Sequence, residues 1–214
     1  MSKILKVKAR QVFDSRGNPT VEAEVYTKNN SATAICPSGA STGTFEAYEK
    51  RDKKNKRYLG KSVFSAVNLV NTEISKKLKG QNIHNQERID TLLINLDGTR
   101  QKTNLGANAM LAVYMAVKKL SAKVKKLPLY KTFTVKNNFQ LPYPLMNIIN
   151  GGAHANNGLR IQEFMIRPDR AKSFSEAMRI SFLVIKSLSQ LIKDKGLSTS
   201  VSYTHLTLPT KRIV

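Results

Sequence analysis

The chain has 214 residues, of which 36 are Lys or Arg and 14 are Asp or Glu, so its formal net charge is +22. The 41% hydrophobic residues can bury a core at this length, which excludes intrinsic disorder, and the single cysteine excludes a framework of intramolecular disulfides. No run approaches the roughly 18 apolar residues that span a bilayer, and no apolar signal segment begins the chain, so we expect a soluble cytoplasmic protein.

The first 35 residues are predicted to form β-strands. In 21–26, apolar residues alternate with others at the period of two that is typical of a half-buried strand. A polar turn over 28–31 leads to a returning strand over 32–35. The loop 37–44 consists of small residues and lacks the Gly-Lys-Ser/Thr ending of a Walker loop. This loop either simply connects two elements or forms a flap over a ligand.

Three amphipathic helices are expected next. The apolar residues of 63–78 recur every three or four positions and form one helical stripe. A shorter stripe over 89–96 has Asn85 as its candidate N-cap. A third stripe covers 109–124, and Pro128 ends this helix.

After these helices the pattern changes to short apolar runs. The runs 142–149 and 161–166 are typical of strands with both faces covered. A long helix is expected from Ser173, where Glu176 completes a capping box. Its apolar residues are predicted to face inward; they are Met178, Phe182, Ile185, Leu188 and Ile192. The fold class is therefore an α+β domain, a small sheet plus helices, followed by the opening of an α/β layer, with the boundary near 127–141.

Charge is distributed unevenly along the chain. From Gly98 to Gln162 there are ten Lys or Arg residues and no acidic residue. A basic face of this kind can attract phosphate on a nucleic acid or on a small substrate, but a solvated lysine-rich surface is the favoured interpretation, because lysine side chains are mostly exposed. Because no aromatic-rich nucleic-acid signature is interleaved with the lysines and tryptophan is absent, nucleic-acid binding is not the favoured interpretation.

Three further places combine residues that can carry chemistry. The stretch 14–20 places Asp14 and Arg16 in a turn between strands, where each can satisfy the other or the backbone. A double glycine precedes His154, and a backbone without side chains there could approach a ligand closely. Glu163, next to Gln162, interrupts an apolar strand, and a carboxylate in such a strand is costly unless it is paired or functional.

Several segments form a pattern whose order and spacing are specific. They are Asp14–Glu22, Pro37–Gly43 with Glu46-Ala47, Arg57–Lys61, Leu96–Thr99, Leu105–Ala109, Asn147–Ile166 and Lys195–Val201. Together they resemble the enolase family, and the resemblance extends to about residue 201. It implies an N-terminal domain over 1–127 and, over 141–201, the first strands and helix of an incomplete β/α barrel. The first two barrel strands would be antiparallel to each other.

The resemblance also implies a reaction and residue roles. The reaction is the reversible, Mg²⁺-dependent dehydration of 2-phosphoglycerate to phosphoenolpyruvate in glycolysis, with two metal ions in the complete site. Ser41 matches the loop serine that helps to bind the second Mg²⁺. His154 matches a catalytic histidine that contacts the substrate, and Gln162 matches a substrate-binding glutamine. Glu163 matches the catalytic, substrate-binding glutamate near the departing hydroxyl. Family members are typically homodimers and are also found at cell surfaces.

The similarity ends abruptly after Val201, where the family continues with Gly-Asp-Glu-Gly-Gly. We expect 202–214 to be a non-native tail and the chain to be a fragment. The catalytic lysine and the three acidic ligands of the first Mg²⁺ are not present, so the fragment itself is expected to lack dehydratase activity. The alternatives are a basic module that binds nucleic acid or protein, and a scaffold role.

Overall fold

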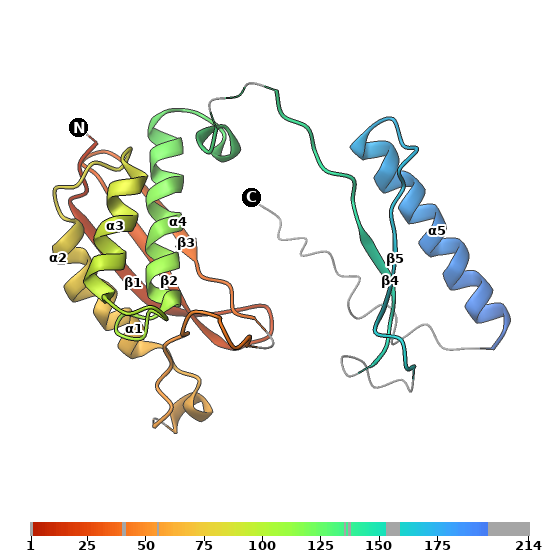
Figure 1. Ribbon diagram of the computed structural model, residues 1–214, viewed down its shortest axis with the longest axis horizontal. Coiled ribbons are helices and arrows are strands. Elements are labelled where there is room, and N and C mark those ends of the chain that lie inside the picture. The colour runs from red at the N-terminus through yellow and green to blue at the C-terminus, as the bar shows by residue number, and fades with distance from the viewer. Residues whose placement is uncertain are drawn as a thin grey trace. The chain divides into compact units, whose positions relative to one another are not determined.

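A computed structural model describes residues 2–39, 42–54, 56–134, 136, 138–152 and 159–196. The chain divides into two compact units, Met1–Asn137 and Asn138–Val214. In the described residues, the first unit contains a three-stranded sheet with helices, and the second contains a two-stranded sheet and a long helix (Figure 1).

The sheet of the first unit is antiparallel and has the order β1-β2-β3. Its strands are β1 (Lys6–Phe13), β2 (Pro19–Tyr26) and β3 (Ser31–Ile35). The apolar side chains of β2 are fully buried, as the alternation predicts. Glu22, on the other face of β2, is also only 8% exposed, because the Arg10 guanidinium covers its carboxylate with bonds of 2.8 and 3.1 Å. The central strand is thus more deeply buried than a half-buried strand.

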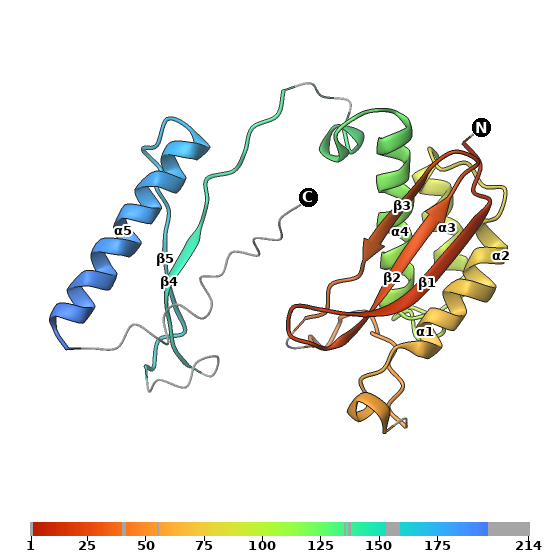
Figure 2. The same ribbon diagram turned by 180° about the vertical axis from the view of Figure 1, so that it is seen from behind.

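The helices of the first unit lie against one face of this sheet, as the opposite views in Figures 1 and 2 show. They are α1 (Phe64–Leu69), the π-helical turn η2 (Val70–Ile74), α2 (Ser75–Leu78), α3 (Gln86–Asp97) and α4 (Ala107–Val124). Two 3₁₀ turns are η1 (Arg57–Gly60) and η3 (Leu129–Thr132). The run from α1 to α2 packs on β1, and α4 packs on β2 and β3. The apolar stripes predicted for these segments form the core.

The ends of α3 follow the predicted local chemistry. The Asn85 side chain accepts a hydrogen bond of 3.0 Å from the backbone N–H of Arg88, which confirms Asn85 as the N-cap. Gly98 follows the last helical residue in the left-handed conformation, at φ 70°, where a residue without Cβ is least strained.

The second unit pairs β4 (Met146–Asn150) with β5 (Glu163–Ile166), and α5 (Phe174–Asp194) follows. The two strands are antiparallel, as the resemblance implies. Ser173 caps α5 by accepting a bond from the N–H of Glu176, as predicted. The Glu176 carboxylate, however, accepts from the N–H of Lys172 rather than completing the box at Ser173.

Two burial predictions for this unit are wrong in the described residues. The strands are not covered on both faces: Phe164 is 48% exposed and Met165 46% exposed. Phe182 of α5 is 56% exposed instead of facing inward, and the other four residues predicted to face inward are only half-buried. A two-stranded sheet and one helix offer too little surface to enclose apolar side chains on every side. No described helix, α5 included, is long and apolar enough to span a membrane.

Candidate functional site

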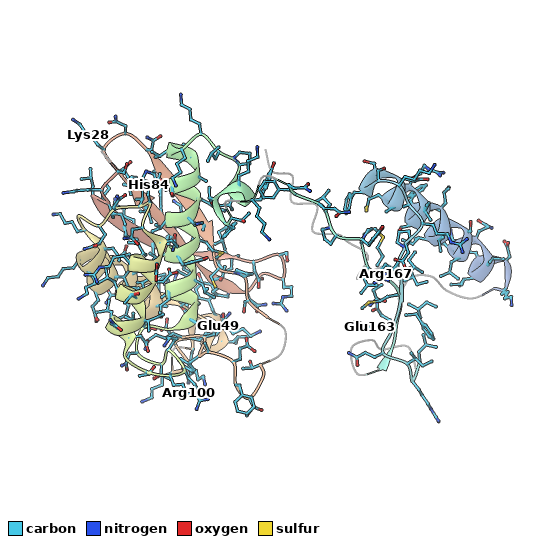
Figure 3. All side chains as sticks on the ribbon, turned by 45° about the horizontal axis from the view of Figure 1, so that its top comes forward. Lys28, Glu49, His84, Arg100, Glu163 and Arg167 are labelled. Atoms are coloured by element: carbon cyan, nitrogen blue, oxygen red, sulfur yellow. The ribbon has the colours of Figure 1, made fainter. Side chains whose placement is uncertain are left out.

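The start of β5 lies against the end of β4, and this pairing positions two of the predicted site residues. Glu163, labelled in Figure 3, is the first residue of β5. It pairs with Asn150, the last residue of β4. Beyond the strands, the N–H of Gly151 donates to the carbonyl of Gln162 at 2.8 Å, and the N–H of Gly152 donates to that of Leu159 at 2.7 Å. The backbone of 159–163 is therefore held along the glycine pair.

The glycine pair allows another backbone segment of the same chain to pack closely against it. A Cβ at Gly151 would lie 2.6 Å from the Cβ of Leu159 and closer still to the carbonyl oxygen of Ile161, so no side chain fits there. Gly152 adopts φ +63°, the left-handed region that disfavours side chains. The close approach that the double glycine predicts therefore exists, but in the described residues the partner is the segment 159–162, just before β5.

The predicted site residues fall into two groups. Gln162 and Glu163 are described, and both are exposed. A Glu163 carboxylate in solvent carries no desolvation cost, so the burial argument made from the sequence does not hold for this structure. His154 and Ser41 lie outside the described residues.

The turn between β1 and β2 behaves as the sequence predicts. Oδ1 of Asp14 accepts hydrogen bonds from the N–H groups of Arg16, at 2.9 Å, and Asn18, at 2.8 Å. The Arg16 guanidinium lies 3.7 Å from the second carboxylate oxygen. Burial alone raises the pKa of Asp14, but the bonds from Asn18 and Arg16 outweigh it, so the pKa is lower than usual.

Sequence reasoning missed a polar cluster next to this turn. Arg16 donates to the carbonyl of Ser38, and Arg51 donates to the Ser38 hydroxyl and to the Glu49 carboxylate (Figure 3 labels Glu49). These residues are 11 to 22 positions from Ser38 in the chain, so no local spacing signals the contact.

The acid-free basic stretch is partly engaged within the first unit. On α4, Lys119 and Lys123 donate to the carbonyls of Thr33 and Ser31, at 3.3 and 3.1 Å, and Lys118 donates to that of Thr132 at 2.9 Å. Lys119 and Lys123 thus bind backbone acceptors of the edge strand β3, and Lys118 binds one of η3, which gives these lysines a structural role without a nucleic acid.

The described residues contain no group of side chains that forms a metal site. Nowhere in the part of the chain that the structure describes do three His, Cys, Asp or Glu side chains gather closely enough to hold a metal ion. The described residues therefore do not by themselves fit a Mg²⁺ site.

Family comparison matches both units. The model described as "Enolase, N-terminal domain" matches residues 4–133, and "Enolase, C-terminal TIM barrel domain" matches 138–204. A curated enolase of Pelagibacter ubique (strain HTCC1062) is 81% identical over 201 residues, which are 94% of this chain and 48% of that protein. An enolase of Methanococcus maripaludis is 54% identical over 193 residues, 90% of this chain and 45% of that protein. The chain thus spans about half the length of the curated relatives that it matches.

Proposed function

The chain belongs to the enolase family, and from this premise we propose that it forms part of a phosphopyruvate hydratase, a lyase of glycolysis that interconverts 2-phosphoglycerate and phosphoenolpyruvate. This reaction takes a proton from a carbon beside a carboxylate and expels a hydroxyl group. Negative charge develops on the substrate, so the site must supply donors and cations where that charge appears.

The observation that carries this proposal within the second unit is the pairing at the start of β5. Backbone hydrogen bonds at Gly151 and Gly152 fix the chain around Gln162, while the side chains of Gln162 and Glu163 remain exposed. An amide and a carboxyl group on a fixed backbone are suited to bind a polar substrate and to exchange a proton with a departing hydroxyl. We assign substrate binding to Gln162 and both substrate binding and acid-base work at the hydroxyl to Glu163.

Ser41 and His154 complete the assignment from family resemblance. We propose that His154 contacts the substrate and that Ser41 is one ligand of a Mg²⁺ ion. The family implies a metal in general; Mg²⁺ suits oxygen ligands and phosphate-bearing substrates. Because the described residues contain no metal-binding cluster, no step through the metal follows from them.

The remaining assignments concern partners and location. We propose a cytoplasmic homodimer for the complete protein. Binding to nucleic acid is not favoured, because the comparisons match enolases and three lysines of α4 already bind backbone carbonyls.

A chimera tests the function directly. Residues 1–201 of this chain are joined to the part of the P. ubique enolase that the chain does not match, and phosphoenolpyruvate formation from 2-phosphoglycerate is followed by absorbance. We expect Mg²⁺-dependent turnover by the chimera and no turnover by the 214-residue chain alone.

Two variants of the chimera make the assignment specific. Glu163→Gln keeps the shape of the side chain but removes its acid-base function, and should lower kcat by 10² to 10⁴-fold, roughly the contribution of general acid-base catalysis. Glu73→Gln, which neutralises an exposed carboxylate in η2, is the matched control and should keep full activity. An inactive chimera with a native circular dichroism spectrum, or an active Glu163→Gln variant, contradicts the proposal.

A further inference from the structure

The imidazole ring of His84, labelled in Figure 3, joins two parts of the first unit that are far apart in the chain. Its Nδ1 atom lies 2.8 Å from the hydroxyl of Ser121 on α4, and its Nε2 atom lies 3.1 Å from the hydroxyl of Ser2. Ser121 is only 4% exposed. Both ring nitrogens are therefore used, and one of the two contacts is shielded from water.

The N-terminal segment, residues 2–5, is also attached through its backbone. The N–H of Ile4 donates to the carbonyl of Gln81 at 2.8 Å, and the N–H of Ile83 donates to the carbonyl of Ser2 at 2.9 Å. The side chain of Ile4 is fully buried in the core. These bonds attach the N-terminal segment to the connection between α2 and α3, and the imidazole links it to α4.

The two contacts of the ring suit a neutral imidazole. A neutral imidazole has one donor and one acceptor nitrogen, so it donates to one serine hydroxyl and accepts from the other. An imidazolium has two donors and no acceptor, so the hydroxyl that donated to the ring must turn and accept instead. Protonation therefore disrupts the hydrogen-bond arrangement across the ring.

The surroundings of His84 also oppose its protonation. Burial, then the positive charge of Lys125 just after α4, then that of the amino terminus lower the pKa of His84. None of the ion pairs among the described residues includes His84, so no carboxylate at ion-pair distance offsets these charges. The stability that depends on the neutral ring is thus complete above pH 6.5 and is lost as pH falls from there toward the lowered pKa.

We propose that His84 is a pH-sensitive latch, which ties residues 2–5 to α4 while its ring is neutral and loosens this N-terminal segment when mildly acidic solution protonates it. The latch lies within the first unit and is independent of the proposed function.

Imidazole titration tests the protonation step on the full 214-residue chain. The C–H resonances of the three histidines are followed by NMR between pH 8 and pH 4.5, and the resonance missing in His84→Gln assigns His84. The pKa of His84 should lie below 6.5, the usual value for histidine. Lys125→Gln removes one opposing charge and should raise that pKa. Lys126→Gln, at an exposed neighbour that is not among the charges acting on the ring, is the matched control and should leave it unchanged.

Hydrogen exchange tests the loosening. Protection factors, corrected for the pH dependence of intrinsic exchange, are compared at pH 7.5 and pH 5 for peptides covering 1–12, 79–85 and, as a reference on β2, 19–26. Acidification of the wild type should lower protection in the first two by about five- to tenfold, the size expected for one lost hydrogen bond, and leave the reference unchanged. In His84→Gln, whose amide offers a donor and an acceptor at either pH, protection should not respond to pH. Lys125→Gln should lose less protection than the wild type.

The two experiments distinguish a latch from a histidine with a purely structural role. A pKa of His84 at or above 6.5, or equal wild-type protection in 1–12 at both pH values, overturns the latch. An equal loss of protection in the wild type and in His84→Gln overturns the assignment to His84. Should His84→Gln fail to fold, the two lysine variants still decide the matter: an identical response of Lys125→Gln and Lys126→Gln overturns the proposal.

Discussion

Close neighbours constrain several single residues of this protein. Gly151 lies against Leu159 and Ile161, and Cys36 is buried in the core of the first unit with 3% exposure. In each case the neighbouring residues limit the space or the solvent that the residue can reach. These contacts make predictions that concern one residue at a time.

Replacement of Gly151 by Ala should loosen the β4–β5 pairing. The new Cβ has no room against Leu159 and Ile161, so the strands must separate at a cost of roughly 1–3 kcal/mol. Hydrogen exchange of peptides from 146–166 measures the loss of protection. Gly43→Ala is the control, because its Cβ would meet only Glu46 Oε2 at 3.9 Å. Equal protection in both variants would show that Gly151 is not crowded.

The thiol of Cys36 should make stability fall at high pH. Burial, with a smaller effect of the Glu49 charge, raises its pKa from 9.0 to about 11. The folded thiol keeps its proton where the unfolded thiol loses it, so this stabilisation is complete below pH 9 and is lost as pH rises toward 11. Urea unfolding at pH 8 and pH 11 should show a loss of about 2–3 kcal/mol that Cys36→Ala lacks. A pH dependence identical in both proteins would contradict this prediction.

At the scale of elements, some stabilising contacts depend on local sequence alone, whereas others depend on packing between elements. The Asn85 cap of α3 is a purely local device, readable from the residues around it. The lysines of α4 that bind carbonyls of β3 belong to a helix face whose role appears only once the sheet is beside it. Local devices can therefore be tested by single substitutions with known magnitudes.

Removal of the α3 cap should cost a predictable amount. Asn85→Ala leaves the Arg88 N–H without its side-chain acceptor and should lower the free energy of unfolding by about 1 kcal/mol. Chemical denaturation of the full chain measures this loss. Asn85→Asp retains an acceptor oxygen, so it should unfold close to the wild type; if it loses as much as Asn85→Ala, the cap is not the cause.

At the scale of the whole molecule, apolar surface is divided unequally between the two units. The first unit encloses its apolar stripes between a sheet and helices, although it also exposes apolar residues such as Phe45 and Leu59. In the described part of the second unit, both the sheet and the helix leave apolar residues exposed, namely Phe164, Met165, Phe182 and Leu191. Exposed apolar patches of this kind drive association in water. The second unit should therefore govern the solution behaviour of this chain.

Self-association should depend on α5. The paired change Phe182→Ser and Leu191→Ser, at positions 56% and 58% exposed, should lower micromolar association of the full chain without unfolding it. Sedimentation velocity across a concentration series measures this. Ile94→Ser on α3, at 49% exposure, is the control for a scattered apolar residue and should change nothing. Unchanged association of the α5 variant would contradict the prediction that these exposed apolar residues of α5 drive self-association.

The sequence by itself determined the helical stripes, the caps at Asn85 and Ser173, the turn at Asp14 and the family, because these depend on periodicity and on residues close in the chain. Tertiary structure alone decided the burial of Glu22 under Arg10, the crowding at Gly151 and the exposure of α5. It also decided the hydrogen bonds that Arg16 and Arg51 donate to Ser38. The contacts among these join residues that are not neighbours in the chain, and the exposure of α5 reflects how few such contacts cover it among the described residues. Hydrogen bonding and desolvation act on those neighbours, whatever their separation in sequence.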